Sequence, residues 1–425
     1  MKIVVAAGGR FHAVRLAQEL YARKALYRFV SGSYTKADQA NIPSALVDSI
    51  TSSQVIDQII WRTRLASVIR PSTLYVAKDA WFDHRLKAAI KKLEPFDIFV
   101  GWAHYFLESL SEIRKKAKIV IVESGSCHIE EHERLIVDQC RKLNLPTTHL
   151  SPANRNKILA EYAASDYIMT PSTFARASFL RKGFAPEKIL QIPCGMDIDF
   201  FTNTIPLERA SGFFRLLFVG QLQIGKGIHT LLEAWRNLRL DTTKAELLLV
   251  GNLQKDVRLL LERYPLPAGV RIIPGVSRIE LKKLYDSAHA FVLPSIQDGF
   301  GMVLGEAMAS GLPVIASMNT GAPDIFRSKD DGVLVPAGDI EALADAISQL
   351  YQNKELRIAL AAAGIECIKD FTWQRYGDST FRMYEELLRK LDLQTQKDPI
   401  QPSLILPGSS IEVEDDRREN TLINS

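Results

Sequence analysis

Two carboxylates and two glycines stand close together where a strand, a loop and a helix are predicted to follow one another. Asp298 precedes the tripeptide Gly299-Phe300-Gly301, and Glu306 follows the aspartate by eight positions. An apolar run that ends at Pro294 predicts a buried parallel strand, and a short helix is expected to begin at Gly301 or Met302. Glycines let a ligand approach the backbone, and the free N–H groups of a helix start favour an anion. The stretch therefore indicates either a ligand site or an ordinary strand–helix unit with a turn-forming aspartate and a solvated glutamate.

A lysine between two glycines forms a second candidate site. Lys226 stands between Gly225 and Gly227, after an apolar run over 215–220 and before a helix expected over 228–238. Exposed N–H groups, the positive end of the helix dipole and the lysine charge together suit a phosphate. The spacing and the Lys-Ser/Thr ending of a Walker A loop are absent, so the pattern does not predict a P-loop.

The strand–loop–helix pattern recurs along the chain and predicts two α/β domains. At 425 residues the chain is too long for one average domain. About six strand candidates fall in each half, and the second half starts again with the apolar run at 215–220. The first half opens with a strand over 2–7 and with Gly8-Gly9-Arg10. This opening indicates a Rossmann-like unit, but it lacks the full dinucleotide-binding fingerprint.

Two histidines follow the predicted ends of strands, where ligand-bearing loops gather in a parallel sheet. His128 follows a strand over 118–122, and His104 follows a strand over 97–101. Each is a candidate for chemistry as well as for a structural place, and His128 is the first choice. His128 and His132 have the spacing of one helix face, but no HExxH arrangement and no third ligand accompany them. No metal site is therefore predicted.

Composition narrows the classes of function. The 53 Lys and Arg residues exceed the 49 Asp and Glu residues by a net +4, which is too mild to require a nucleic-acid partner. Four scattered cysteines are typical of free thiols in a reducing cytoplasm.

No apolar run approaches the ~18–20 residues of a membrane-spanning helix. A basic stretch over 79–93 is more typical of a solvated face than of contact with anionic lipid. The predicted location is the cytoplasm, with peripheral attachment at the inner face of the plasma membrane left open.

These motifs resemble those of glycosyltransferase family 4, whose members are retaining enzymes of the GT-B fold. The acidic pair Asp298 and Glu306, the glycines between them and the Lys226 loop carry the resemblance, which covers roughly residues 167–391. It implies an α/β fold of two Rossmann-like domains that face each other across a cleft. The implied division is an acceptor domain over 1–195, a nucleotide-sugar domain over 196–370, a helix over 371–392 that crosses back, and a disordered tail over 393–425.

The resemblance also implies a role for each site residue. Catalytic roles fall to Asp298, Lys226 and His128. Donor-binding roles fall to Gly299, Phe300, Gly301, Glu306, Gln221 and Val276. Gly9 and Arg10 match an early loop that, in the family, lies across the cleft from the donor phosphates.

Two positions depart from the family's pattern. Asp298 stands where Glu is usual, so the charge is kept on an arm shorter by one methylene. Gln221 stands where an Arg usually helps the lysine to grip the diphosphate. One fixed positive charge is therefore missing, unless another cation such as Arg10 compensates.

The implied reaction is transfer of a hexose from a nucleotide diphosphate-sugar to a saccharide or lipid-linked acceptor, with retention of anomeric configuration, in polysaccharide or glycolipid assembly. No metal or cofactor is expected, because Lys226 and a helix N-terminus can stabilise the leaving diphosphate. Two rivals stay open. A nucleotide-sugar epimerase of the same fold would form product without an acceptor, and a non-catalytic binding protein would bind nucleotide weakly and turn over nothing.

Overall fold

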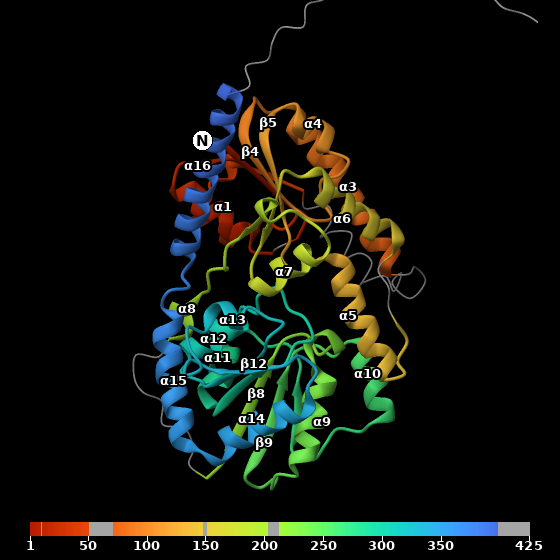
Figure 1. Ribbon diagram of the computed structural model, residues 1–425, viewed down its shortest axis with the longest axis vertical. Coiled ribbons are helices and arrows are strands. Elements are labelled where there is room, and N and C mark those ends of the chain that lie inside the picture. Colours follow the sequence, from red (N-terminus) through yellow and green to blue (C-terminus); the bar gives the residue numbers. More distant parts are fainter. Residues whose placement is uncertain (10, 51–70, 148–150, 203–211, 398–425) are drawn as a thin grey trace, which may run out of the picture.

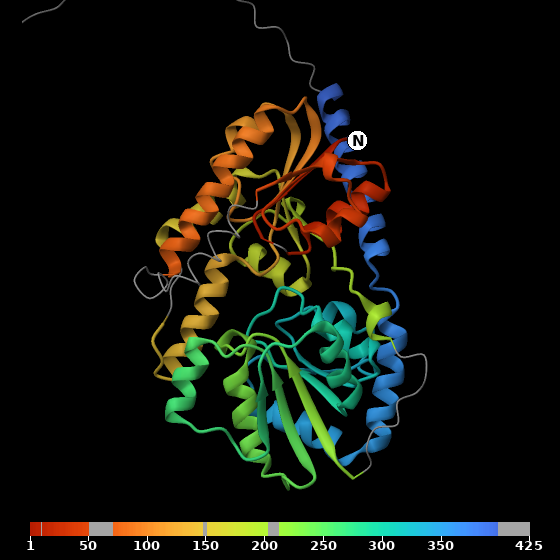
Figure 2. The same cartoon turned by 180° about the vertical axis from the view of Figure 1, so that it is seen from behind.

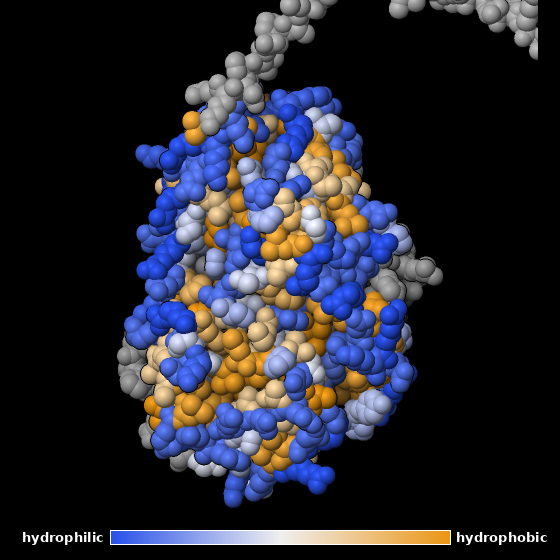
Figure 3. All heavy atoms as spheres, in the orientation of Figure 1, coloured by the Kyte–Doolittle hydropathy of each residue, from blue (hydrophilic) through white to orange (hydrophobic). Residues whose placement is uncertain are grey.

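The computed structural model describes residues 1–9, 11–50, 71–147, 151–202 and 212–397. Two parallel sheets, each covered by helices, form two domains stacked along the long axis of the molecule (Figure 1). On the face shown in Figure 3, hydrophobic residues gather over the second domain, and hydrophilic residues dominate the edges. No helix among the described residues combines the length and the apolar character needed to cross a membrane.

The first domain is built on a seven-stranded parallel sheet in the order β3-β2-β1-β4-β5-β6-β7. Every residue of β1 is fully buried, as expected for a strand with helices on both faces. The strand order changes direction between β1 and β4, which opens a crevice at their carboxyl ends. The strands are β1 (Ile3–Ala7), β2 (Leu26–Ser31), β3 (Val47–Ser49), β4 (Phe96–Trp102), β5 (Ala117–Glu123), β6 (Tyr167–Thr170) and β7 (Ile189–Gln191). The helices are α1 (Ala13–Ala22), α3 (Pro71–Lys91), α4 (Leu110–Arg114), α5 (Ile129–Lys142), α6 (Pro152–Ala164) and α7 (Thr173–Arg181).

The second domain repeats this plan on a six-stranded parallel sheet in the order β10-β9-β8-β11-β12-β13. Here the order changes direction between β8 and β11, so the loops that follow these two strands meet at one edge of the sheet. The strands are β8 (Phe214–Val219), β9 (Ala245–Val250), β10 (Val270–Ile273), β11 (Ala290–Leu293), β12 (Val314–Ser317) and β13 (Val333–Val335). The helices are α9 (Ile228–Leu238), α10 (Lys255–Arg263), α11 (Arg278–Ser287), α12 (Val303–Ala309), α13 (Ala322–Ile325), α14 (Ile340–Gln352) and α15 (Lys354–Ile368).

The predicted α/β fold of two Rossmann-like domains is confirmed, and the helix bounds differ in detail. The helix expected from Gly301 or Met302 begins at Val303. The last helix, α16 (Trp373–Lys397), continues past the expected end near residue 391, since no Gly or Pro stands between that residue and Pro399. The rest of the predicted tail, over 398–425, lies outside the described residues.

The chain crosses between the domains twice at one place. The short helix α8 (Ile198–Phe201) leads into the second domain, and α16 returns along the first domain (Figures 1 and 2). Met196 and Thr372 form an isolated parallel bridge between the two crossing segments. A Cβ on Gly195 would lie 2.5 Å from the Cα of Trp373, so only glycine lets the two backbones come this close.

The carboxylate of Asp197 hydrogen-bonds to several segments that meet at this crossing. Asp197 accepts two hydrogen bonds from one guanidinium nitrogen of Arg15 on α1, with lengths of 2.6 and 2.7 Å. It also accepts one from Arg278 on α11 at 2.9 Å and one from the indole N–H of Trp373 on α16 at 2.8 Å. The first domain, the second domain and the returning helix therefore share one acceptor.

We expect Asp197→Ala to lower the free energy of unfolding by about 1–3 kcal/mol, because it removes an acceptor shared by two arginines and an indole. Urea denaturation of the purified protein measures this change. The matched control is Asp378→Ala, which removes from α16 an exposed partner of Arg23, the residue that directly follows α1. Exposed pairs contribute little, so the control should lose less than about 1 kcal/mol. Equal losses in the two variants would contradict the special place given to Asp197.

Candidate functional site

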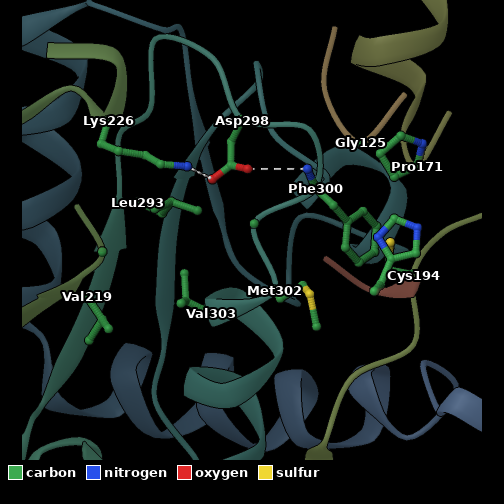
Figure 4. Close-up of a pocket in the computed structure, with 13 residues that line it drawn as sticks. Gly125, Pro171, Cys194, Val219, Lys226, Leu293, Asp298, Phe300, Met302 and Val303 are labelled. Atoms are coloured by element: carbon green, nitrogen blue, oxygen red, sulfur yellow. Dashed lines mark hydrogen bonds and ion pairs between the residues drawn. The ribbon is translucent and has the colours of Figure 1, made fainter. Parts of the chain in front are cut away.

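A pocket of about 260 Å³ lies where the two domains meet (Figure 4). The second domain contributes two of the three residues that were given catalytic roles, Lys226 and Asp298, together with Phe300 and Gly301. Apolar side chains around Leu293 form its floor. The first domain and the crossing segment contribute His12, Gly125, Pro171 and Cys194.

Lys226 and Asp298 form an ion pair inside this pocket. The Lys226 ammonium donates to a carboxylate oxygen of Asp298 at 2.5 Å, and both side chains are mostly buried. Lys226 follows β8 and Asp298 follows β11, so the change in strand order brings these distant residues together. Gly227 ends the lysine loop with a φ of +73°, and a Cβ there would lie 2.0 Å from the carbonyl oxygen of Pro294. Glycine is thus required where the two loops touch.

The loop between the predicted acidic pair also contacts the first domain. The Gly299 carbonyl accepts a hydrogen bond from the Ser172 hydroxyl at 2.6 Å. A Cβ on Gly299 would lie 1.9 Å from the carbonyl oxygen of Gly125. The sequence suggested that these glycines let a ligand approach, but at Gly299 the missing side chain makes room for the other domain. Phe300 is 4% exposed and packs against Gly321.

Further hydrogen bonds cross the same junction. Asp324 of the second domain accepts from the backbone N–H of Thr173 at 2.9 Å and from its hydroxyl at 2.5 Å. It therefore adds to the cap of α7 in the first domain, because Thr173 is the first residue of that helix and the N-cap residue Ser172 accepts from Ala175. The Ser126 hydroxyl donates to the side-chain oxygen of Gln297 at 2.9 Å. The structure therefore holds the two domains in contact on both sides of the pocket.

Glu306 lies on α12, outside the residues that line the pocket. The Tyr285 hydroxyl donates to its carboxylate at 3.0 Å. Burial raises the pKa of Glu306 above its ordinary value of 4.5, against the opposing effects of the Tyr285 hydrogen bond and the charge of Arg278.

Three other predicted residues are outside the pocket lining. Gln221 is exposed, and its side-chain oxygen accepts from Gln254 at 2.6 Å. Val276 is half-buried just before Ser277, the residue that caps α11. Gly9 lies under the ring of Phe11. Arg10, the predicted partner of Gly9, lies outside the described residues.

The structure does not bring His128 to the pocket. His128 is the N-cap of α5, and its ring nitrogen accepts from the backbone N–H of Glu130 at 3.3 Å. Its ring packs among Tyr162, Phe179 and Phe184, and burial lowers its pKa to about 4. The geometry gives the side chain a structural role, as a helix cap inside an aromatic cluster, and its catalytic role stays a prediction.

His104, the second choice, is also outside the pocket lining. Its backbone has a φ of +89°, and its N–H donates to the buried carboxylate of Glu161 at 2.6 Å. Burial lowers the pKa of its imidazole to about 4.

His12 is a pocket histidine that the sequence reasoning missed. It follows the Gly8-Gly9-Arg10 loop by two positions, which was the available signal, but no motif marks it. Among the described residues, no cluster of histidine, cysteine and carboxylate side chains could hold a metal ion.

Two family models match the chain, and together they cover most of it. The description "Glycosyltransferase Family 4" matches residues 6–200, and "Glycosyl transferases group 1" matches residues 202–366. The chain belongs to glycosyltransferase family 4. The predicted family is thus confirmed, and the boundary between the two matches falls at the crossing near α8 of this family 4 chain.

Curated relatives of this family 4 chain share about a quarter to a third of its sequence over the aligned part. A phosphatidyl-myo-inositol mannosyltransferase of Mycobacterium leprae is 33% identical over 202 residues, which are 46% of this chain and 53% of that protein. A D-inositol 3-phosphate glycosyltransferase of Paenarthrobacter aurescens is 25% identical over 339 residues, 76% of each chain. The chain spans about half the length of the first curated relatives that it matches.

Solved structures agree with the fold. A sucrose-phosphate synthase from Thermosynechococcus elongatus superposes with a TM-score of 0.64 at 20% identity, covering 92% of this chain and 100% of that one. The Anabaena HepE protein in complex with UDP superposes with a TM-score of 0.61 at 15% identity, covering 91% and 100%. These likenesses confirm the GT-B fold of the family 4 chain.

We expect Glu306→Gln to stabilise the protein at neutral pH. The raised pKa means that the folded state disfavours the charged carboxylate, so the stability of the wild type falls as the pH rises above 4.5. A glutamine keeps an oxygen for the Tyr285 hydroxyl but carries no charge. Thermal unfolding followed from pH 4 upward, at roughly half-unit steps, should show a gap between the two proteins that widens and then levels off. A gap that shrinks with rising pH would contradict the direction of the pKa shift.

We expect Gly299→Ala to loosen the contact between the domains, because its Cβ cannot coexist with the Gly125 carbonyl at 1.9 Å. Small-angle X-ray scattering should then show a larger radius of gyration than for the wild type. Gly125→Ala is the matched control, since a Cβ on Gly125 meets nothing within 4 Å. The explanation fails if the control expands the molecule as much as Gly299→Ala does.

Proposed function

We propose that this chain transfers a hexose from a nucleotide diphosphate-sugar to a hydroxyl of a saccharide or lipid-linked acceptor, with retention of anomeric configuration. The observation that carries the proposal is the pairing of Lys226 with Asp298 in a pocket between two Rossmann-like domains. Relatives named as a mannosyltransferase and as inositol glycosyltransferases, and solved neighbours named with UDP or UDP-glucose, support it.

Lys226 supplies a positive charge where the leaving diphosphate gathers negative charge. The helix α9 begins two residues later and directs its free N–H groups and positive dipole end to the same loop. Such prearranged charges act most strongly on charge that develops in the transition state. This scheme uses neither a metal nor a cofactor.

Asp298 gains a second role when the diphosphate arrives. In the structure its carboxylate holds Lys226, so an incoming anion competes for the lysine. The carboxylate then becomes an acceptor for hydroxyl groups of the donor sugar, beside the backbone amides of Gly299, Phe300 and Gly301. Glu306, held by Tyr285 at one oxygen, would accept from the ribose hydroxyls, and Val276 and Gln221 would lie by the base and the diphosphate.

The test is a thermal-shift panel of nucleoside diphosphates and nucleotide sugars, with the uridine compounds first. A ligand at about 100 times its Kd should add roughly 2.7 kcal/mol of stability. Lys226→Met should weaken the binding of the diphosphate by roughly 10- to 100-fold, as expected for a lost hydrogen bond to a charged group. Lys244→Met is the matched control, because Lys244 is exposed and lies before β9 at the opposite edge of the sheet.

The rival functions are distinguished by adding a turnover assay with the nucleotide sugar that binds. A transferase releases nucleoside diphosphate only when an acceptor is added, and the anomeric signal of the product in NMR matches that of the donor. An epimerase converts the donor sugar without an acceptor. A protein that shows no shift with any nucleotide has no donor site of the kind proposed.

A further inference from the structure

His12 stands in the candidate pocket without the role that its position in the chain suggests. It occupies the N-cap position of α1, yet its side chain makes no capping hydrogen bond. The side chain is 11% exposed and lines the same pocket as Lys226 and Asp298. The ring of His12 therefore does not serve as a helix cap, whereas the ring of His128 does.

A buried carboxylate stands behind this imidazole. Glu123, the last residue of β5, is 2% exposed, and its Oε2 lies 3.6 Å from the Nε2 of His12. Its other oxygen, Oε1, is buried and has no hydrogen-bond partner among the described residues. Burying a carboxylate with so few partners costs stability, so the fold gains nothing evident from this residue.

Two aromatic rings fix the imidazole from other elements. The ring of Trp102, at the end of β4, meets His12 edge-on at a centroid distance of 5.0 Å. The ring of Tyr376, on the returning helix α16, meets it at 6.1 Å and nearly at a right angle. The imidazole is therefore packed on its sides, and its orientation is set by both the sheet and α16.

The carboxylate also gives the two ring nitrogens different surroundings, since Glu123 lies on the side of Nε2. A neutral imidazole has one N–H donor and one bare nitrogen acceptor, and a carboxylate beside Nε2 favours the proton there. Nδ1 is then left as an acceptor. Lys226, the one lysine or arginine among the described residues that line the pocket, offers only donors, so His12 adds an acceptor from the first domain to that of Asp298.

We propose that His12, oriented by Glu123, accepts a hydrogen bond from a sugar hydroxyl in this pocket. The inference rests on the proposed transferase function and deepens it, since it assigns a residue of the first domain to the sugar. The hydroxyl belongs either to the donor sugar or to the acceptor, and both offer the same O–H donor. Glu123 acts as a positioning residue behind His12.

The experiment compares binding of a nucleoside diphosphate with binding of the matching nucleotide sugar, both by calorimetry, and adds the rate of transfer to acceptor. His12→Phe removes the acceptor atom and keeps a ring, whereas His12→Asn restores an oxygen near the place of Nδ1. Glu123→Gln removes the charge behind the ring. His84→Ala is the control, because His84 makes a similar pair with Glu108 at 3.2 Å but is 65% exposed and outside the pocket.

If the hydroxyl belongs to the donor sugar, His12→Phe weakens the nucleotide sugar roughly 3- to 10-fold and leaves the nucleoside diphosphate within about twofold. If it belongs to the acceptor, both affinities stay unchanged, and the transfer rate or the acceptor KM suffers by that factor. In either case His12→Asn recovers part of the loss. Glu123→Gln follows His12→Phe in direction while its melting temperature is equal to or above that of the wild type.

Two results would overturn the inference alone. One is a His12→Phe variant that matches the wild type in both affinities and in transfer. The other is an equal loss for the nucleoside diphosphate and the nucleotide sugar, which would place His12 on the phosphates instead. A wild-type protein that binds no nucleotide sugar would overturn the proposed function together with this inference.

Discussion

The pocket requires the carboxyl edges of the two parallel sheets to face each other. The carboxylate of Asp197 stabilises the crossing between the domains that gives the sheets this arrangement. The oxygens of this carboxylate accept hydrogen bonds from Arg15 of the first domain, Arg278 of the second and Trp373 of the returning helix. Each sheet has its own change of strand order, and each crevice alone is half a site. The pocket forms because the crossing between the domains places the two crevices opposite each other.

The strands, and the loops that carry Lys226 and Asp298, could be predicted because their signals are local. Apolar runs end at a loop, and a cation or a carboxylate stands beside glycine within a few residues. The sequence also placed Asp298 and Lys226 at one site, through resemblance to a family. It did not predict their ion pair, which depends on β8 and β11 being neighbours in the sheet.

The rest of the site could not be predicted, because it depends on contacts across more than a hundred positions of sequence. Ser172 meets Gly299 and His12 meets Glu123, and neither pair shares a motif. His128 shows a different limit of sequence reasoning, since its position suits two roles. It stands where a strand gives way to a helix, the place that suggests chemistry, and the same place calls for a helix cap. A histidine at this position suits both catalysis and helix capping. The sequence alone does not separate the two roles, because the surrounding aromatic rings come from distant segments.

The cap that Asp324 provides to α7 has a consequence for how long the cleft stays shut. The first N–H group of α7, on Thr173, is satisfied by the other domain, so parting the domains returns that group to water. Release of any product trapped between the domains must therefore break a helix cap as well as the contacts to the product. The time that a product stays in the cleft then depends on the hydrogen bonds between the two domains as well as on the contacts to the product itself.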